Sequence, residues 1–445
     1  MSKNFIKFIN HASVVISNGK KSILTDPWYS GTSFDDGWML LYENEKSEII
    51  NILNQTDYIW ISHEHPDHFS IKFLNDYEDI LREKKIKFIF QDTKDKRVVS
   101  FLKFKKFDFI ELEDNQNFDL DEKFFIKVQK YDFYDSALII NINGKKIFNL
   151  NDCPIKTENQ VKEFKKKYGE CDFLLTQFSY AAWKGGKENL EWRKSASKEK
   201  INTIKNQSNI LNSKITIPFA SFIKFCDKYN SYLNDSINTP NIVMEKCSEI
   251  NAKIKFLKPY EVFDLDNPYK ETDGIGFWTE IYKNRENFQI IENKKAYTYE
   301  DLNEMFYEFN DRIYKNNSKI LIKIISKIKF LNYFQALIIK IKDLDVNIKV
   351  DLANNKFEQV NEKPDIEMFS RSLYLIFKQD FGFDTLTVNG CFEEKKKNGF
   401  LKMSKCFAIG NLNNLGIKLN YKIFFNLNII FLFIKKIFII KKKLV

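Results

Sequence analysis

The residues best placed to do chemistry lie in one short stretch, residues 63–68, with the sequence HEHPDH. It holds three of the four histidines of the chain. His63 and His65 are two positions apart, so on an extended chain their imidazoles point the same way and can share one metal ion. Asp67 and His68 follow on the turn and can reach a second ion beside the first. Imidazole and carboxylate ligands suit zinc, iron or manganese.

The neighbouring segments must position this stretch. Residues 57–62 are rich in β-favouring side chains and predict a buried strand that ends at the histidines, and residues 70–82 have a helical pattern. We therefore expect the histidines on a loop at the carboxyl end of a strand, where open α/β sheets carry functional residues. A solvated, His-rich turn is the alternative. H-x-H-x-D-H after an apolar strand is far more specific than a single histidine, and it favours the metal site.

This motif is similar to that of the metallo-β-lactamase superfamily, and the likeness continues outside it. Residues 11–16 (HASVVI), residues 23–28 (ILTDPW) and the glycine- and aromatic-rich residues 31–38 resemble the branch that contains CMP-N-acetylneuraminate hydroxylase and its bacterial relatives. The resemblance covers roughly residues 1 to 265. It implies an α/β fold for residues 1–267, a four-layer αββα sandwich, and the strands and helices predicted between residues 86 and 150 fit that architecture.

The resemblance also suggests roles for single residues outside the motif. It implies that Asp152, at the end of a predicted strand, is a carboxylate that bridges two metal ions; an Asx turn is the alternative. It implies that Asp26 orients a ligand histidine by hydrogen bonding, although a simple Asp-Pro turn would use the same residue. His11 is flanked by apolar residues, and we interpret it as a histidine of the core or pocket wall rather than a ligand.

Two histidines of the complete superfamily pattern are missing, because no histidine follows His68. In our alignment with the hydroxylase-like branch their positions hold Tyr131 and Asp227. Asp227 could complete the second ion's ligands, whereas Tyr131 is a poor substitute and the neighbouring Asp132 is the alternative. Three outcomes stay open at this point: one bound ion, two weakly bound ions, or a vestigial site.

The resemblance implies a metal-dependent hydrolase that acts on a small molecule. A metal-bound hydroxide, held by His63, His65, His68 and Asp152, would attack an ester, amide, lactone or phosphoester. The branch suggests a sugar nucleotide, a glycan precursor or a lipid-type substrate. Asp67 is the predicted catalytic residue, which would bind the second ion and orient the water. We expect one or two divalent transition metal ions, zinc first and iron or manganese as alternatives.

Two other functions remain open. The first is a hydroxylase or monooxygenase component. The chain has no Cys-His pairs of the kind that hold a Rieske cluster, so such a component would need a separate electron carrier. The second is a non-catalytic, degenerate metal-binding protein, which the two missing histidines suggest.

The length of 445 residues predicts more than one domain. We expect an α+β accessory domain at residues 285–420, weakly similar to sterol-carrier-like modules, that forms a homodimer or caps the pocket. In it, residues 365–378 are predicted as a helix and residues 381–390 as a loop and strand. Residues 421–445 form an apolar, basic tail, and its apolar stretch, residues 423–434, is shorter than the ~20 residues of a spanning helix. Peripheral membrane contact and a strand pair completing the domain are the alternatives.

Composition limits the partners and the compartment. The net charge is +10, but six lysines and no acid lie in residues 421–445, and no nucleic-acid-binding signature is present. We therefore expect no nucleic-acid partner. The six cysteines are scattered and none form C-x-x-C. This pattern indicates a reducing compartment, and the N-terminus lacks an apolar signal core, so we expect a cytoplasmic protein.

Overall fold

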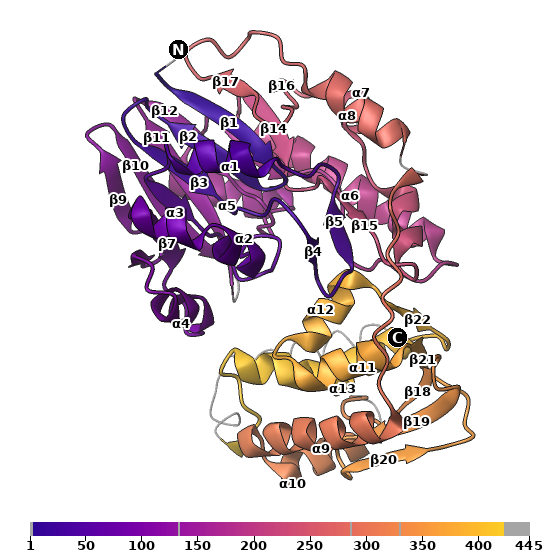
Figure 1. Cartoon of the computed structure of the whole chain (residues 1–445). Helices are drawn as coiled ribbons and strands as arrows, with labels where there is room; N and C mark the ends of the chain where they lie inside the picture. Colours follow the sequence, from indigo (N-terminus) through magenta and orange to yellow (C-terminus); the bar gives the residue numbers. More distant parts are fainter. Residues whose placement is uncertain (1–2, 132–133, 285–286, 329–330, 422–445) are drawn as a thin grey trace. The chain divides into compact units, whose positions relative to one another are not determined.

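The computed structural model describes residues 3–131, 134–284, 287–328 and 331–421. The chain divides into two compact units, residues 1–293 and 294–445 (Figure 1). The first unit therefore includes residues beyond the boundary at 267 that the sequence suggested. These residues include helix α8 (Gly274–Lys283), whose Trp278 is fully buried and stacks on Phe222 with ring centroids 3.9 Å apart. Burial of an aromatic ring this size joins α8 to the core of the first unit.

One sheet of the first unit carries the N-terminal strands. Among the described residues it has seven strands in the order β17-β1-β2-β3-β6-β7-β8. Their bounds are β1 (Phe5–Asn10), β2 (Ser13–Ser17), β3 (Ser22–Thr25), β6 (Tyr58–Trp60), β7 (Lys87–Gln91), β8 (Phe109–Leu112) and β17 (Val262–Asp264). Strands β3, β6, β7 and β8 are parallel to one another. The loops after β3 and β6 therefore leave the sheet at the same edge.

A second sheet is formed by later strands. Within the described ranges it has seven strands in the order β16-β14-β13-β12-β11-β10-β9. Their bounds are β9 (Asn117–Asp121), β10 (Phe124–Tyr131), β11 (Asp135–Ile142), β12 (Lys145–Asn149), β13 (Phe173–Gln177), β14 (Ile215–Phe219) and β16 (Lys253–Ile254). Strands β12, β13 and β14 are parallel, with Leu175 opposite both Asn149 and Ile217. The loops after these three strands share one edge.

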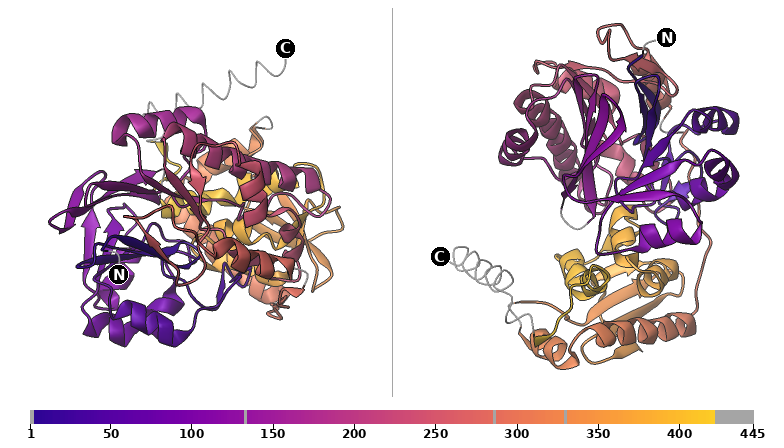
Figure 2. Two further views of the ribbon diagram at one scale, coloured as in Figure 1. Left: turned by 90° about the horizontal axis from the view of Figure 1, so that it is seen from above. Right: turned by 90° about the vertical axis from the view of Figure 1, so that its left-hand side faces the viewer.

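Helices cover the outer faces of both sheets, and the two sheets lie between them (Figure 2, right). The first sheet packs against α1 (Lys46–Leu53), α2 (Ile71–Asp76), α3 (Glu78–Glu83) and α4 (Arg97–Phe104) through one apolar cluster. The second sheet packs against α5 (Glu158–Tyr168) and the end of α6 (Leu190–Ile210) through another. This arrangement is the predicted αββα sandwich, which the structure confirms.

Shorter elements complete the first unit. A small sheet pairs β5 (Trp38–Leu40) with β4 (Thr32–Ser33) on one side and β15 (Ile223–Phe225) on the other. The 3₁₀ helix η1 (Ser231–Ser236) and α7 (Pro240–Lys246) follow β15. The helix predicted over residues 70–82 is instead two helices, α2 and α3. Tyr77 separates them, because its backbone leaves the helical region at φ −120° and ψ 16°.

The second unit is an α+β domain with a sheet in the order β20-β19-β18-β21-β22 among the described residues. Its bounds are α9 (Tyr299–Asn316), α10 (Lys319–Lys327), β18 (Leu337–Ile341), β19 (Val346–Asp351), β20 (Lys356–Gln359), β21 (Ile366–Met368), α11 (Ser370–Lys378), α12 (Gly382–Asn389), β22 (Phe392–Glu394) and α13 (Gly399–Asn414). The smaller α+β domain expected in this half of the chain is therefore present.

Two predictions in this unit were wrong. Residues 365–378 are not one helix, since the short strand β21 precedes α11. Residues 381–390 form helix α12 rather than a loop and strand. Its first residue, Gly382, lies so close to Leu375 that an added Cβ would be 2.0 Å from the Leu375 carbonyl oxygen. Glycine here permits a close approach of two helices and does not mark a loop.

The predicted apolar tail lies outside the described residues, apart from Tyr421. Within the described ranges, no helix is both long enough and apolar enough to span a membrane. The six cysteines are all buried and free, as expected for a chain without a disulfide framework.

Candidate metal centre

The loop with the HEHPDH sequence follows β6 and is fixed by Ser62. The Ser62 backbone N–H donates to Asp26 Oδ1 at 2.7 Å, and Asp26 directly follows β3, with a left-handed φ of 36°. The Ser62 carbonyl accepts hydrogen bonds from Gln91 Nε2 at 3.0 Å and from Ser136 Oγ at 2.6 Å. Residues from both sheets therefore hold the start of the loop, which gives the following side chains a defined geometry.

His68 is fully buried, and its two ring nitrogens have different neighbours. Nδ1 is 3.0 Å from Asp26 Oδ2 and 3.1 Å from Ser62 Oγ. A carboxylate acceptor at Nδ1 favours the tautomer that leaves the lone pair on Nε2. Nε2 lies 3.3 Å from Asp67 Oδ2 and 3.6 Å from Asp152 Oδ2. Asp26 thus contacts a predicted ligand histidine, as the resemblance implied.

The charges around His68 favour a cation at this position. Burial alone lowers the pKa of His68, but the carboxylates of Asp67 and Asp26 raise it well above its ordinary value. For Asp67, burial acts to raise the pKa, and His68 and His11 outweigh it and hold that pKa well below the usual range. Asp67 therefore stays ionised, and the point between its carboxylate and Nε2 attracts positive charge.

His63 and His65 lie beside His68. His63 Nδ1 is 2.9 Å from Ser62 Oγ, and its Nε2 is 3.0 Å from His65 Nδ1. The rings of His63 and His68 have centroids 4.1 Å apart. Burial, followed by the neighbouring His68, lowers the pKa of His63 well below its ordinary value. His63 is therefore neutral near pH 7, which is the state that binds a metal ion.

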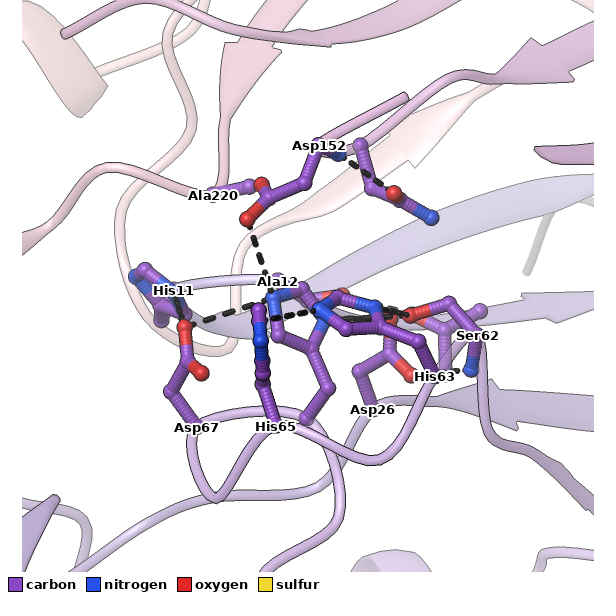
Figure 3. Close-up of polar contacts among 12 residues, drawn as sticks. His11, Ala12, Asp26, Ser62, His63, His65, Asp67, Asp152 and Ala220 are labelled. Carbon is purple, nitrogen blue, oxygen red and sulfur yellow. Dashed lines mark hydrogen bonds and ion pairs between the residues drawn. The ribbon is translucent and has the colours of Figure 1, made fainter. Parts of the chain in front are cut away.

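Asp152 reaches the histidines from the second sheet. It follows β12, where Asn151 has a left-handed φ of 30° and redirects the chain. Oδ1 of Asp152 accepts a hydrogen bond from Gln177 Nε2 at 2.9 Å, and Oδ2 lies 3.6 Å from His68 Nε2. Figure 3 shows the Asp152 carboxylate on the side of the loop that carries His63, His65 and Asp67. The carboxylate points toward the histidines, as its predicted role requires.

His11 is the residue whose position the sequence interpretation did not foresee. It is buried after β1, where its φ is 38°, and its Nε2 is 3.3 Å from Asp67 Oδ2. Its ring meets those of Trp28 and His68 edge-on, with centroids 5.7 and 5.9 Å away. The ring is buried, as a histidine of the core or pocket wall would be, but it also stands among potential ligands. The scarcity of histidine in the chain was the one signal for it.

Two overlapping groups of potential ligands result among the described residues. One consists of His63, His68 and Asp152, and the other of His11, Asp67 and His68; within each, one ligand atom per residue lies within 4.8 Å of the others. His65 Nδ1 adjoins the first group through His63. The groups overlap at His68, whose Nε2 has a single lone pair, so this nitrogen can bind an ion in only one of the two groups at a time. The number of ions, one or two, stays a prediction.

The remaining predicted ligands are not in these groups. Asp227 is buried after β15, where its Oδ1 accepts a hydrogen bond from the Tyr229 backbone N–H at 2.8 Å. Tyr131 ends β10 opposite Asp135 and packs against the apolar core of the second sheet. The alternative Asp132 lies outside the described residues.

Tyr134 occupies part of the space near the histidines. Its ring centroid is 5.2 Å from that of His65 and 6.3 Å from that of His63. Its backbone carbonyl accepts a hydrogen bond from Gln91. A tyrosine three positions past the aligned residue therefore borders the histidines. Sequence reasoning missed it because the alignment pointed to Tyr131.

The residues present fit a divalent transition metal. Asp67 Oδ1, His11 Nδ1 and His68 Nε2 are buried and have no hydrogen-bond partner among the described residues. Buried polar atoms in proteins normally have such a partner, and a bound ion would provide one for the two that point into the groups, Asp67 Oδ1 and His68 Nε2. Nitrogen and carboxylate oxygen donors are those preferred by zinc, iron and manganese.

Part of the first unit matches a known protein family. Residues 5–152 match the family described as "Beta-lactamase superfamily domain". These residues include the strands of the first sheet up to β8, the HEHPDH loop and Asp152. Residues 5–152 of the first unit are therefore similar to this superfamily's domain, which confirms the resemblance that the sequence suggested.

The chain is also similar to several curated proteins that are named as hydroxylases. The chain is 26% identical over 312 residues to the cytidine monophosphate-N-acetylneuraminic acid hydroxylase of Cricetulus griseus, which covers 64% of this chain and 53% of that protein. A human relative, named as an inactive form of this hydroxylase, is 26% identical over 64% of this chain and 60% of its own length. The Danio rerio hydroxylase is 24% identical over 65% and 52%. The chain thus matches between half and three fifths of these relatives.

Two solved structures with some likeness to this chain are the following. One is the diiron β-hydroxylase CmlA of Streptomyces venezuelae, with a TM-score of 0.41, 12% identity, and coverage of 60% of this chain and 55% of that one. The other is a possible metal-dependent hydrolase of Veillonella parvula, with a TM-score of 0.42, 11% identity, and coverage of 60% and 100%.

Proposed function

We propose that the first unit is a metal-dependent hydrolase of a small molecule. The observation that carries the proposal is the meeting of two carboxylates at one imidazole nitrogen. Asp67 Oδ2 and Asp152 Oδ2 approach His68 Nε2 to 3.3 and 3.6 Å from two different sheets. Two carboxylates this close to one buried nitrogen repel each other unless a cation lies between them.

A bound divalent metal would supply Lewis acidity and lower the pKa of water toward neutrality. The chain's own residues would do the rest. His63, His65, His68 and Asp152 would hold the first ion position, and Asp26 would keep the His68 lone pair directed at it. Asp67 would orient the attacking water, since its Oδ1 has no hydrogen-bond partner among the described residues.

We propose zinc as the ion, with iron or manganese as alternatives, and an ester, amide, lactone or phosphoester as the substrate bond. The relatives are named for a sugar nucleotide, cytidine monophosphate-N-acetylneuraminic acid. This name supports a sugar-nucleotide or related phosphorylated substrate for this chain. Asp227, predicted as a further ligand, does not join either group and is left out of the proposal.

The test is elemental analysis of the purified full chain, for the wild type and the double variant His63→Ala/His65→Ala. We expect one or two equivalents of a transition metal in the wild type and a loss of at least the first equivalent in the variant. Glu64→Ala is the matched control, because Glu64 lies between the two histidines and pairs with Arg97 at the surface. No bound metal in the wild type, or equal metal in the double variant, would refute the proposal.

An oxygenase component is the second candidate, because the curated relatives are named hydroxylases. Such a component would draw electrons from a separate carrier. The two functions differ in their need for O₂. Turnover of a phosphoester or lactone substrate under strictly anaerobic conditions supports hydrolysis, whereas turnover that requires both O₂ and a reduced electron carrier supports the oxygenase.

A further inference from the structure

A small cavity of about 130 Å³ adjoins the metal centre on the other side of Asp152. Three lysines line it, and they come from three separate segments. Lys156 lies between β12 and α5, Lys184 follows β13, and Lys200 is on α6. Asp152, Glu199 and Gln177 also line it. Three ammonium groups against two carboxylates leave an excess of positive charge around one small cavity.

Lys200 is connected to the metal centre through one side chain. Its Nζ donates to Gln177 Oε1, and Gln177 Nε2 donates to Asp152 Oδ1 at 2.9 Å. Gln177 is thus fixed between an ammonium and a carboxylate. Burial lowers the pKa of Lys200 to about 8, with Asp152 acting in the opposite direction. Lys200 is therefore mainly charged at neutral pH.

Lys184 lacks a counter-charge of its own. Among the described residues it makes no ion pair or hydrogen bond. Burial, and then the neighbouring Lys156, lower the pKa of its ammonium. Lys156 differs, because it pairs with Glu199 at 3.2 Å and both side chains are partly exposed. The cavity therefore contains more positive charge than its own carboxylates neutralise. A half-buried ammonium without a partner is costly unless a ligand supplies one.

We propose that this cavity binds a phosphoryl group of the substrate, with Lys184 and Lys200 as its ligands and Lys156 at the entrance. The identity of the ligand as a substrate group rests on the proposed function. A phosphoryl group offers several oxygen acceptors and more than one negative charge, which suits two or three ammonium donors. Because Asp152 borders both the cavity and the metal centre, a phosphoryl group held here places the adjoining part of the same molecule at the metal ligands.

The test is calorimetric titration of the full chain with inorganic phosphate. We compare the wild type, Lys184→Ala, and Lys184→Ala/Lys200→Met, with the metal content measured on every sample. We expect phosphate affinity about tenfold lower in the single variant, the loss of roughly one charge-assisted hydrogen bond, and no measurable binding in the double variant. Lys198→Ala is the matched control. Lys198 is exposed on α6, the helix that also carries Lys200, and it does not line the cavity.

Phosphate also binds metal ions directly, so the titrations are repeated after chelation of the metal. Binding that persists without metal and falls in Lys184→Ala supports the lysine site. Phosphate affinity that is equal in the wild type and the double variant overturns it. These outcomes are separable from those of the proposed function. If the chain holds no metal but binds phosphate through Lys184, the phosphoryl site is supported and the hydrolase is refuted. If the chain holds metal but the lysine variants bind phosphate as tightly as the wild type, the hydrolase is supported and the phosphoryl site is refuted.

Two further probes distinguish the sources of the phosphoryl group, and a third tests whether the cavity prefers phosphate to a carboxylate. A nucleoside 5′-monophosphate represents a nucleotide, glycerol 3-phosphate represents a lipid headgroup, and acetate represents a carboxylate. We expect one of the two phosphate esters to bind more tightly than inorganic phosphate, with the same sensitivity to Lys184→Ala, and acetate to bind more weakly. Acetate binding as tightly as phosphate would contradict a phosphoryl site.

Discussion

The histidine cluster and the lysine cavity lie on the two sides of one carboxylate, and they are chemical opposites. Asp152 Oδ2 faces His68, in a group of nitrogen and oxygen donors that attracts a cation. Asp152 Oδ1 accepts from Gln177, which in turn accepts from Lys200, beside ammonium groups that attract an anion. One side chain thus separates a cation site from an anion site. The comparison shows how a single molecule could be held at two points with the reacting bond between them.

The largest effect that we expect comes from His68, because both ligand groups contain it. His68→Gln keeps a similar volume but removes the imidazole, and it should reduce bound metal to less than about a tenth of the wild-type content. Metal analysis after dialysis measures it. Phosphate binding to the lysine cavity should be unchanged in the same sample, provided that the circular dichroism spectrum is native. Full metal content in this variant would show that His68 is not part of a metal site, and it would refute the contrast between a cation site and an anion site.

A smaller effect is expected from His11, which belongs to only one of the two groups. His11→Ala should weaken the ion position next to Asp67 by about tenfold and leave the one next to Asp152 intact. Zinc titration in competition with a chelating dye resolves the two affinities. A wild type that takes up two ions and a His11→Ala variant that takes up the same two with equal affinities would show that His11 is only part of the pocket wall.

The smallest expected effect is a pH dependence of the lysine cavity. Sulfate keeps the same charge between pH 7 and pH 9, whereas Lys200 loses its proton as the pH rises through about 8. Glu199 and Asp152 oppose this loss, and Lys156 and Lys184 promote it. Sulfate affinity should therefore fall severalfold between pH 7 and pH 9. Calorimetry in the two buffers measures it, and the dependence should flatten in Lys200→Met; an equally steep dependence there would assign it to another group.

The histidine cluster and the lysine cavity also differ in how well the sequence predicts them. The predicted metal ligands His63, His65, Asp67 and His68 fall within six consecutive residues, so their spacing alone suggests a metal site. Strand β6 before them and the helices after them have clear periodicity, and the αββα fold followed from these patterns and the resemblance. Asp152 was found only because the resemblance placed a carboxylate after a strand.

The rest could not be predicted, for physical reasons. Lys156, Lys184 and Lys200 are distant in sequence and are hidden among the many other lysines of the chain, so only the folded arrangement of β12, β13 and α6 brings them together. His11 was assigned to the pocket wall, because its neighbours are apolar and no local pattern shows that the turn after β1 directs its ring toward Asp67. Asp227 was assigned by alignment; its Oδ1 accepts a hydrogen bond from the Tyr229 backbone, and its role as a ligand stays a prediction.

The division of the ligands between two sheets has a consequence for how the chain folds. The loop after β6 supplies His63 and His68 from the first sheet, and the loop after β12 supplies Asp152 from the second. Neither sheet contains all of the proposed ligands, so we expect full ion affinity only once the two sheets have docked. An ion that binds only the docked state raises its population by mass action. Metal supply during synthesis would then govern the yield of the native chain, before any substrate is met.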